Sequence, residues 1–268
     1  NVRKANPKSI SENREITAII QALGLKYGVD YTKDENFNQL NYGRLLILTD
    51  ADTDGKHIAG LIMNFIHYLF PTLLQREKPF LVDMMTPIAR FVMKGDEKVF
   101  YDLNRADEFY KSNSMKGNIK VKYYKGLGTH SDDEIADVFG KRVISFVKDD
   151  KADDNITKVF NSDTHCRKDW IEKYDPNIHT EINEDTLEKN ISTFIDEELI
   201  TFSIDDCKRS IPNLMDGFKQ SQRKILYAAF LKNLKVNSLK VAQFAGYIAE
   251  NTNYHHGEQN LYNTIVKM

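Results

Sequence analysis

The sequence has few of the residues that would mark several classes of protein. Only two of its 268 residues are cysteines, Cys166 and Cys207, which excludes a disulfide-stapled secreted domain and favours a reducing compartment. No apolar run approaches the roughly 20 residues of a membrane-spanning helix, and no charged-then-apolar leader opens the chain. Prolines number six, while 41% of residues are apolar and 11% aromatic, which excludes disorder and low complexity. We therefore expect a soluble intracellular protein without a membrane partner.

Net charge is nearly absent from the total, which is −2, but the charge is uneven along the chain. Residues 131–200 carry nine Lys and Arg against nineteen Asp and Glu, whereas residues 201–268 carry nine against five. The densest basic stretch, residues 208–240, holds eight Lys or Arg and one acid, Asp216. Such a stretch indicates a polyanion partner for the last segment, with a solvated lysine-rich helix face as the alternative.

Hydrophobic periodicity predicts an α/β domain in the first 145 or so residues, within a length that suggests about two domains. Residues 10–25 have helical spacing, with Gly24 or Gly28 as the stop. Apolar residues in steps of three and one from Ile58 to Phe70 predict a second helix that ends at Pro71. The acidic residues 132–198 and the last segment are predicted to be helical. Strands are expected at 44–49, 80–82, 87–93, 99–101 and 121–124, with 87–93 and 99–101 paired.

The most chemically loaded segment is Asp50-Ala51-Asp52-Thr53-Asp54-Gly55, between the strand 44–49 and the helix that follows. Three carboxylates at alternating positions of an extended turn can converge on one point, where a cation relieves their repulsion. Oxygen ligands favour Mg²⁺, Mn²⁺ or Ca²⁺ over zinc, and open α/β sheets bind ligands at the carboxyl ends of strands. A calcium-binding EF-hand is disfavoured because its twelfth position, a glutamate, is Leu61 here. The remaining alternative is a polar turn in which Asp54 caps the helix.

Three other motifs indicate contact with an anion or close backbone approach. Residues 125–129, Lys-Gly-Leu-Gly-Thr, permit tight approach to an anion or a neighbouring element, or form an ordinary turn. Gln222, Arg223 and Lys224 lie near a predicted helix N-terminus, where they reach phosphates or form a solvated basic turn. Residues 254–258, Tyr-His-His-Gly-Glu, can hydrogen-bond a phosphate, although paired histidines are commonly structural and neither cysteine is near enough in sequence to favour zinc.

Taken in order, these motifs strongly resemble those of a type IIA DNA topoisomerase of the eukaryotic kind. The resemblance covers most of the chain. Each motif is short, but five or six in a fixed order make coincidence improbable. The segments that carry it are residues 48–55 with the helix 57–65, then 123–129, 167–170, 198–203, 209–224 and 240–258.

The resemblance implies an α/β fold, with a parallel-sheet TOPRIM domain and its flanking helices over residues 1–148. A helical connector over 149–202 and the first part of a mainly α winged-helix DNA-binding domain over 203–268 would follow. In this family the acidic triplet binds Mg²⁺, with Mn²⁺ or Ca²⁺ able to substitute in binding. Asp50 and Asp52 would be the metal ligands, and Asp54 would support the metal and the catalysis.

The same resemblance implies the reaction and the partners. The reaction would be reversible transesterification, in which a tyrosine attacks double-stranded DNA and a second duplex passes through the break. His256, with a lesser role for His255, would assist at the scissile phosphate. The full-length enzyme would be a homodimer that uses ATP through another domain, in the nucleus if cellular and in the host cytoplasm or virion if viral. The DNA-binding residues would be Lys219, Gln222, Arg223 and Lys224.

We interpret the chain as a piece of a longer protein. The resemblance places a TOPRIM glutamate before Asn1, and the nucleophilic tyrosine after Met268, so this piece alone should not cleave DNA. Gln220-Ser221 stands where many relatives have Pro-Gly, and His165-Cys166 replaces an acidic pair, which indicates a divergent member of possible viral origin. Two alternatives stay open: another TOPRIM protein, such as a metal-dependent nuclease or primase, and a non-catalytic DNA-binding module with a structural acidic turn.

Overall fold

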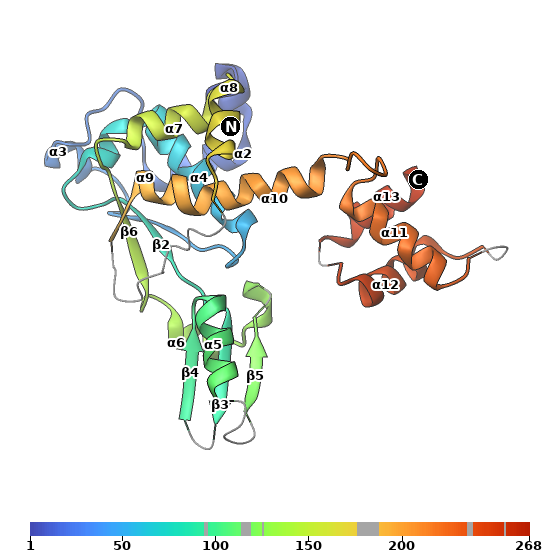
Figure 1. The fold of residues 1–268 in the computed structure, drawn as a ribbon. Coiled ribbons are helices and arrows are strands. Elements are labelled where there is room, and N and C mark those ends of the chain that lie inside the picture. Colours follow the sequence, from blue (N-terminus) through green and yellow to red (C-terminus); the bar gives the residue numbers. More distant parts are fainter. Residues whose placement is uncertain (94–95, 114–118, 125, 176–187, 235–237, 255) are drawn as a thin grey trace. The chain divides into compact units, whose positions relative to one another are not determined.

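The computed structural model describes residues 1–268 except 94–95, 114–118, 125, 176–187, 235–237 and 255. The chain forms two compact units, residues 1–202 (unit 1) and residues 203–268 (unit 2). Unit 1 combines helices with two sheets, which confirms the expected α/β class (Figure 1). No helix among the described residues is both long enough and apolar enough to cross a membrane.

A four-stranded sheet organises unit 1. Its order is β1-β2-β6-β7, with β1 parallel to β2, β2 antiparallel to β6, and β6 parallel to β7. All four residues of β2 are buried, as expected for a central strand that is covered on both faces. The strand bounds are Leu45–Ile47 for β1, Leu81–Met84 for β2, Val143–Val147 for β6 and Glu188–Asn190 for β7.

A smaller antiparallel sheet lies in the same unit, in the order β4-β3-β5, with helix α5 against one face (Figure 1). Phe91 on β3 packs with Ala89 and with Ala106 of α5 in a separate small core. The expected pairing of 87–93 with 99–101 is confirmed, in the register Phe91↔Lys98. The bounds are Ala89–Met93 for β3, Asp96–Phe100 for β4, Lys120–Tyr123 for β5 and Leu103–Asn113 for α5.

Helix α4 (Thr53–Leu69) is the central helix of unit 1. Its buried face differs from the predicted one, since Ile58 is 48% exposed while Met63 and Ile66 are fully buried. The buried stripe begins at Ala59 and recurs every three to four residues, so Ile58 lies beside it. Gly60 allows close packing, because a β-carbon there would lie 3.0 Å from Cδ1 of Leu199.

Shorter helices complete unit 1 around the main core. Helix α2 ends where the sequence predicted, at Gly24, whose φ of 72° is left-handed. The α-helices are α1 (Pro7–Glu12), α2 (Arg14–Leu23), α3 (Asp34–Phe37), α6 (Asp132–Val138), α7 (Ala152–Phe160), α8 (His165–Glu172) and α9 (Ile191–Thr193). The 3-10 helices are η1 (Val2–Lys4), η2 (Pro71–Gln75) and η3 (Leu127–Thr129), and η4 (Phe194–Leu199) is a π-helix.

The segment predicted as a helical connector is helical in large part, but it also supplies a strand and core residues. β7 pairs with β6 in the main sheet, and Trp170 and Phe194 belong to the main core of unit 1. Neither β6 nor β7 was predicted. β6 has a usable signal in Val-Ile-Ser-Phe-Val, with Ile144 and Phe146 buried, whereas the three polar residues of β7 have none.

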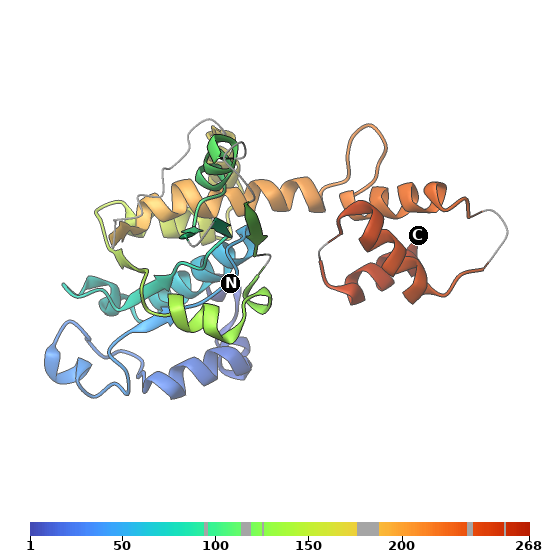
Figure 2. The same cartoon turned by 90° about the horizontal axis from the view of Figure 1, so that it is seen from below.

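Unit 2 is a small helical bundle in its described part (Figures 1 and 2). Helices α11 (Gln220–Leu231), α12 (Val241–Thr252) and α13 (Glu258–Lys267) pack around Ala228 and Ile248, which are fully buried. Helix α10 (Ile200–Ser210) begins in unit 1 and continues into unit 2. The described residues of 203–268 contain no strand, in keeping with the predicted mainly α segment.

Candidate functional site

The acidic turn lies at the carboxyl end of β1, as the sequence predicted, and it is held by the start of α4. Asp52 is the N-cap of α4, and its Oδ1 accepts a hydrogen bond of 2.8 Å from the amide of Gly55. The alternative with Asp54 as the cap is therefore wrong: Asp54 lies in the first turn, because the helix begins at Thr53. An acidic side chain there interacts favourably with the helix dipole.

Asp50 is held from the other side by the glycine-rich loop. Its Oδ1 accepts a hydrogen bond of 2.7 Å from the amide of Leu127. A β-carbon on Gly126 would lie 2.9 Å from Oδ2 of Asp50, so only glycine lets the loop approach this closely. The expectation that this motif allows close backbone approach to an anion is confirmed, and the anion is the carboxylate of Asp50. Lys125 lies outside the described residues.

The three aspartates do not converge in this structure. Among the described residues, no three His, Cys, Asp or Glu side chains lie close enough together to hold a metal ion. The physical reason is that one oxygen of Asp52 caps α4 and one oxygen of Asp50 accepts from Leu127. The donors at the turn are nevertheless all carboxylate oxygens, and these suit a hard divalent cation.

A buried ion network that sequence reasoning missed begins two residues after Asp54. Lys56 Nζ lies 2.9 Å from Oε2 of Glu198 and 3.5 Å from Oδ2 of Asp83, and Lys189 pairs with Glu198 as well. The network joins α4 to β2, β7 and η4. It was missed because Lys56, Asp83 and Glu198 are far apart in sequence.

The pKa values in this network follow from burial and pairing. Burial alone would lower the pKa of Lys56, but the charges of Glu198 and Asp83 outweigh it and raise the pKa. Burial raises the pKa of Asp83. Burial also acts to raise the pKa of Glu198, yet Lys56 and Lys189 lower it. Lys56 and Glu198 therefore remain charged at neutral pH.

The predicted DNA-binding residues gather at the N-terminus of α11, and each has an intramolecular partner. Arg223 binds Asp216 through two hydrogen bonds of 2.7 and 2.9 Å, which lower the pKa of Asp216 to about 2. The amide of Lys219 donates to Oε1 of Gln222 over 2.9 Å. These side chains lie at the surface, where a polyanion could reach them.

Lys224 connects the basic segment to the histidine motif. Its Nζ donates a hydrogen bond of 3.1 Å to the carbonyl of Asn253, at the C-terminal end of α12. The exposed His256 lies two residues beyond Tyr254, whose ring it meets edge-on at 5.6 Å. His255 lies outside the described residues. The structure therefore brings two motifs about 30 positions apart to one end of unit 2.

Two family models match the chain. The one described as the C-terminal associated domain of TOPRIM matches residues 84–207, and the one described as DNA gyrase/topoisomerase IV matches residues 209–268. The first match continues across position 148, where the sequence suggested a domain boundary. Together with the α/β fold and the acidic turn, the matches define a protein of the TOPRIM-containing topoisomerase class.

Similarity to known proteins extends over the whole chain. It is 40% identical over 282 residues to DNA topoisomerase 2 of Invertebrate iridescent virus 6, covering 100% of this chain and 25% of that protein. It is 44% identical over 274 residues to a probable DNA topoisomerase 2 of Dictyostelium discoideum, covering 100% and 17%. The crystal structure of the Plasmodium falciparum topoisomerase II DNA-binding, cleavage and re-ligation domain matches with a TM-score of 0.83 and 39% identity, over 99% of this chain and 36% of that one.

The chain belongs to the type II DNA topoisomerase family, and the family predicted from its motifs is confirmed. It spans about a quarter or less of the length of the curated relatives it matches. These relatives include eukaryotic and viral proteins.

Proposed function

We propose that the chain is part of the DNA-binding and cleavage core of an ATP-dependent type II DNA topoisomerase that acts as a homodimer on double-stranded DNA. The observation that carries the proposal is the clasped acidic turn at the end of β1, in a chain similar over its whole length to topoisomerases of this type. The proposal includes the division into a TOPRIM part (1–148), a connector (149–202) and a winged-helix part (203–268). It also places a cellular parent in the nucleus, or a viral one in the host cytoplasm or virion.

The proposed metal ligands are Asp50 and Asp52, with Asp54 in support. Both ligand carboxylates are oriented by backbone amides through Oδ1, and a bound divalent ion would stabilise the charge that develops on the attacked phosphate. Hydrogen bonds from Leu127 and Gly55 fix these side chains in the way that outer-shell partners usually fix metal ligands. A complete site needs further ligands, which the proposed parent protein supplies from outside this chain.

The proposed DNA contacts are Lys219, Gln222, Arg223 and Lys224, with His256 and His255 near the scissile phosphate. The basic end of α11 supports this, because its side chains are exposed and its backbone amides point to the same end. Transesterification by a tyrosine keeps one phosphodiester bond for each one broken, so the break can be resealed without loss of bond energy.

The sharpest test replaces aspartate by asparagine in the longer protein that contains this chain. Asp52→Asn keeps a good N-cap for α4, and Asp50→Asn keeps an oxygen for the Leu127 amide, so both remove charge with little effect on folding. We expect DNA cleavage in Mg²⁺ to fall by at least 100-fold on the scale of lost catalytic groups, with DNA binding retained. Asp133→Asn, an exposed carboxylate of α6, is the control. Normal cleavage by Asp50→Asn would refute its ligand role.

A second measurement separates this function from its alternatives. Mn²⁺ binding to the chain, followed by the relaxation broadening of amides near residues 50–54, should occur at millimolar metal and weaken in Asp50→Asn. Broadening that is absent at millimolar Mn²⁺ would favour a DNA-binding module with a structural turn. The chain alone should not relax supercoiled DNA, and nicking without resealing by the longer protein would favour a nuclease.

A further inference from the structure

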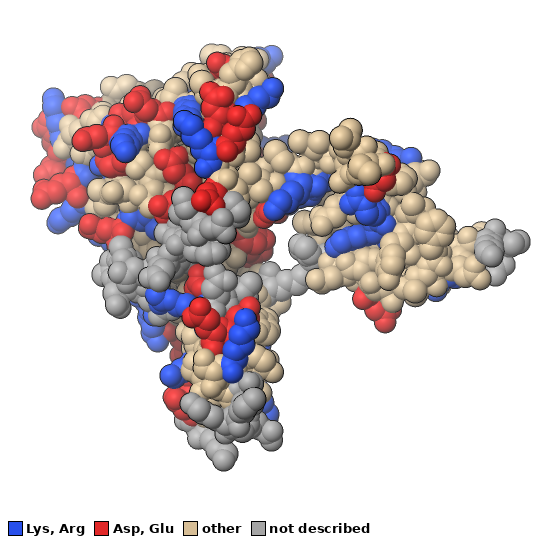
Figure 3. Space-filling view, in the orientation of Figure 1, with Lys and Arg blue, Asp and Glu red and all other residues tan. Residues whose placement is uncertain are grey.

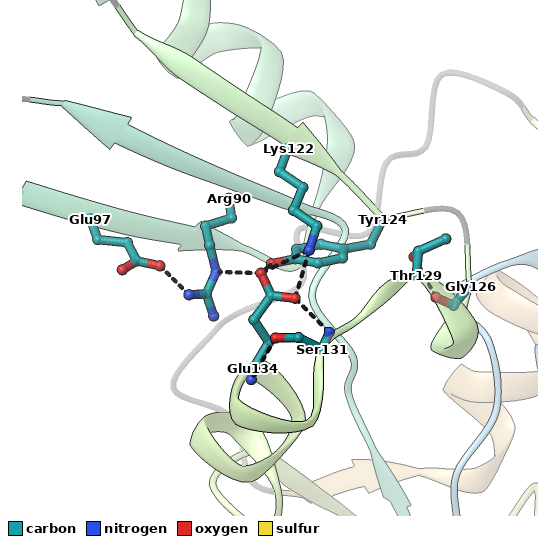
Figure 4. Close-up of polar contacts among 8 residues, drawn as sticks. All are labelled: Arg90, Glu97, Lys122, Tyr124, Gly126, Thr129, Ser131 and Glu134. Atoms are coloured by element: carbon teal, nitrogen blue, oxygen red, sulfur yellow. Dashed lines mark hydrogen bonds and ion pairs between the residues drawn. The ribbon is translucent and has the colours of Figure 1, made fainter.

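A polar cluster centred on Glu134 lies at the base of the loop that clasps Asp50 (Figure 4). Glu134 accepts a hydrogen bond of 2.8 Å from the hydroxyl of Tyr124 and bonds of 2.9 and 2.7 Å from Lys122 Nζ. Its Oε2 also accepts from the amide of Ser131 over 2.8 Å, and Arg90 Nε lies 3.9 Å from its Oε1. Sequence reasoning gave no role to these residues.

The charge state of the cluster is well defined. The hydrogen bonds from Lys122 and from the Ser131 amide lower the pKa of Glu134 to about 2. Burial, followed by the hydrogen bond to Glu134, raises the pKa of Tyr124 to about 12. At neutral pH Glu134 is therefore an anion that accepts from a protonated tyrosine, and charge-assisted hydrogen bonds of this kind are strong. The ring of His130 stacks on Tyr124 at 3.9 Å.

The partners of Glu134 lie on both sides of the glycine-rich loop. Tyr124 precedes the loop, and its own amide donates to Ile88 over 2.8 Å. Ser131 follows the loop and forms a reciprocal capping box with Glu134 at the start of α6. Glu134 thus fixes both ends of the loop at once.

Within the loop, a second contact sets the shape that meets Asp50. The hydroxyl of Thr129 donates to the carbonyl of Gly126 over 2.6 Å (Figure 4), and the amide of Thr129 donates to the same oxygen over 3.1 Å. This short turn presents the amide of Leu127 to Asp50. A loop with fixed ends and a fixed turn holds this amide in place before any ligand binds, which lowers the entropy cost of binding.

We propose that Glu134 is a positioning residue, which holds the Gly126–Thr129 loop in the geometry that orients the carboxylate of Asp50. The role is indirect, because Glu134 contacts the loop ends and the loop contacts Asp50. Only the consequence for metal binding rests on the proposed function, since the positioning of the loop is a property of the chain by itself.

The direct test is hydrogen exchange of the Leu127 amide, measured by NMR in the 268-residue chain. Glu134→Ala should speed this exchange by about tenfold or more, the equivalent of losing roughly 1.4 kcal/mol of local protection. Amides of β2 should stay protected and serve as the internal reference. Asp133→Asn, on the same helix, should leave both unchanged. Unchanged Leu127 protection in Glu134→Ala would overturn the proposal.

Glu134→Gln keeps the shape of the side chain and decides the matter if Glu134→Ala loosens β2 as well. Gln can still accept from Tyr124 and Ser131 but loses the charge that pairs with Lys122, so Leu127 should exchange faster than in the native chain while β2 keeps its protection. Leu127 and β2 exchanging together in both variants would assign Glu134 to general stability and overturn the positioning role.

Mn²⁺ affinity then connects the positioning role to the proposed function. Loss of an outer-shell partner commonly weakens metal binding by about 10–100-fold, and we expect Glu134→Gln to fall at the lower end of that range. Faster Leu127 exchange with unchanged Mn²⁺ affinity would support the positioning role and contradict the ligand role of Asp50. Weaker affinity with unchanged exchange would overturn the positioning role and leave Asp50 as a ligand.

Discussion

The two units use ionic groups in different ways. In unit 1, Lys56, Asp83 and Glu198 form a network whose side chains are 30%, 8% and 16% exposed. In unit 2, Arg223 and Asp216 form a pair whose side chains are 45% and 37% exposed. The first network joins residues more than 100 positions apart, whereas the second pair is separated by seven positions.

The difference teaches which charges stabilise the fold and which remain available to a partner. Buried ions must be paired, since the loss of one partner leaves the other uncompensated, while an exposed pair contributes little to stability. On the face shown in Figure 3, acidic and basic side chains alternate over unit 1. Unit 2 combines its exposed pairs with an excess of four positive charges over residues 201–268, which suits an exchange of internal partners for phosphates.

The largest effect should come from breaking the buried network of unit 1. Lys56→Met leaves Glu198 and Asp83 without their shared cation, and the loss of one partner of a buried pair costs about 3–5 kcal/mol. Urea denaturation of the chain, followed by far-UV circular dichroism, measures the free energy of unfolding. Lys8→Met is the matched control, because the Lys8–Glu12 pair is exposed and should change stability by about 0.5 kcal/mol or less. Equal stability of the two variants would contradict the structural role of the network.

A smaller effect is expected where a side chain is added beside Asp50. The β-carbon in Gly126→Ala would displace the carboxylate of Asp50 and break its bond to Leu127, for a cost of about 1 kcal/mol. Gly128→Ala is the control two residues away, because nothing lies within 4 Å of a β-carbon there. Hydrogen exchange at Leu127 should rise in the first variant only. Similar exchange in both would show that the close approach of loop and carboxylate has no energetic role.

Acid should remove the contribution of Glu134 while the exposed control carboxylate behaves differently. Because pairing lowers the pKa of Glu134 from 4.5 to about 2, its stabilising effect is complete above pH 4.5 and declines as the pH falls toward 2. The difference in unfolding free energy between the native chain and Glu134→Gln should therefore be constant from pH 5 to 7 and shrink below that range. Denaturation curves at half-unit pH steps measure it. A difference that grows in acid would refute the sign, and Asp133→Asn should show little difference throughout.

Much of this arrangement is predictable from the sequence because its signals are local. The strand before Asp50, the helix after it and the glycine stop at Gly24 all follow from short-range patterns, and the fixed order of motifs identified the family. Glycines at a loop beside an acidic turn also indicate a close approach. These features depend on neighbouring residues, which a single sequence displays.

The rest depends on contacts between distant segments, which no local pattern displays. The strand β7 has only three polar residues and exists because β6 pairs with it. Glu134 and Lys56 look like ordinary surface charges until the fold brings Tyr124 and Glu198 to them. The convergence of the three aspartates was expected from alternating spacing alone, and it failed because the start of α4 and the amide of Leu127 each take one carboxylate oxygen.

The smallest effect on stability, and the clearest one on binding, is expected at the exposed pair of unit 2. Arg223→Gln should weaken binding of the chain to duplex DNA uniformly across sequences, and should reduce the slope of log K against log salt by about one, as for one lost phosphate contact. Asp216→Asn should act in the opposite direction, because it releases Arg223 from a competing carboxylate. Fluorescence anisotropy with a labelled duplex at several salt concentrations measures both, and the unfolding free energy of each variant should stay close to that of the native chain. If both substitutions weakened DNA binding, the Arg223–Asp216 pair would be the recognised structure, and Arg223 would not exchange its carboxylate for a phosphate.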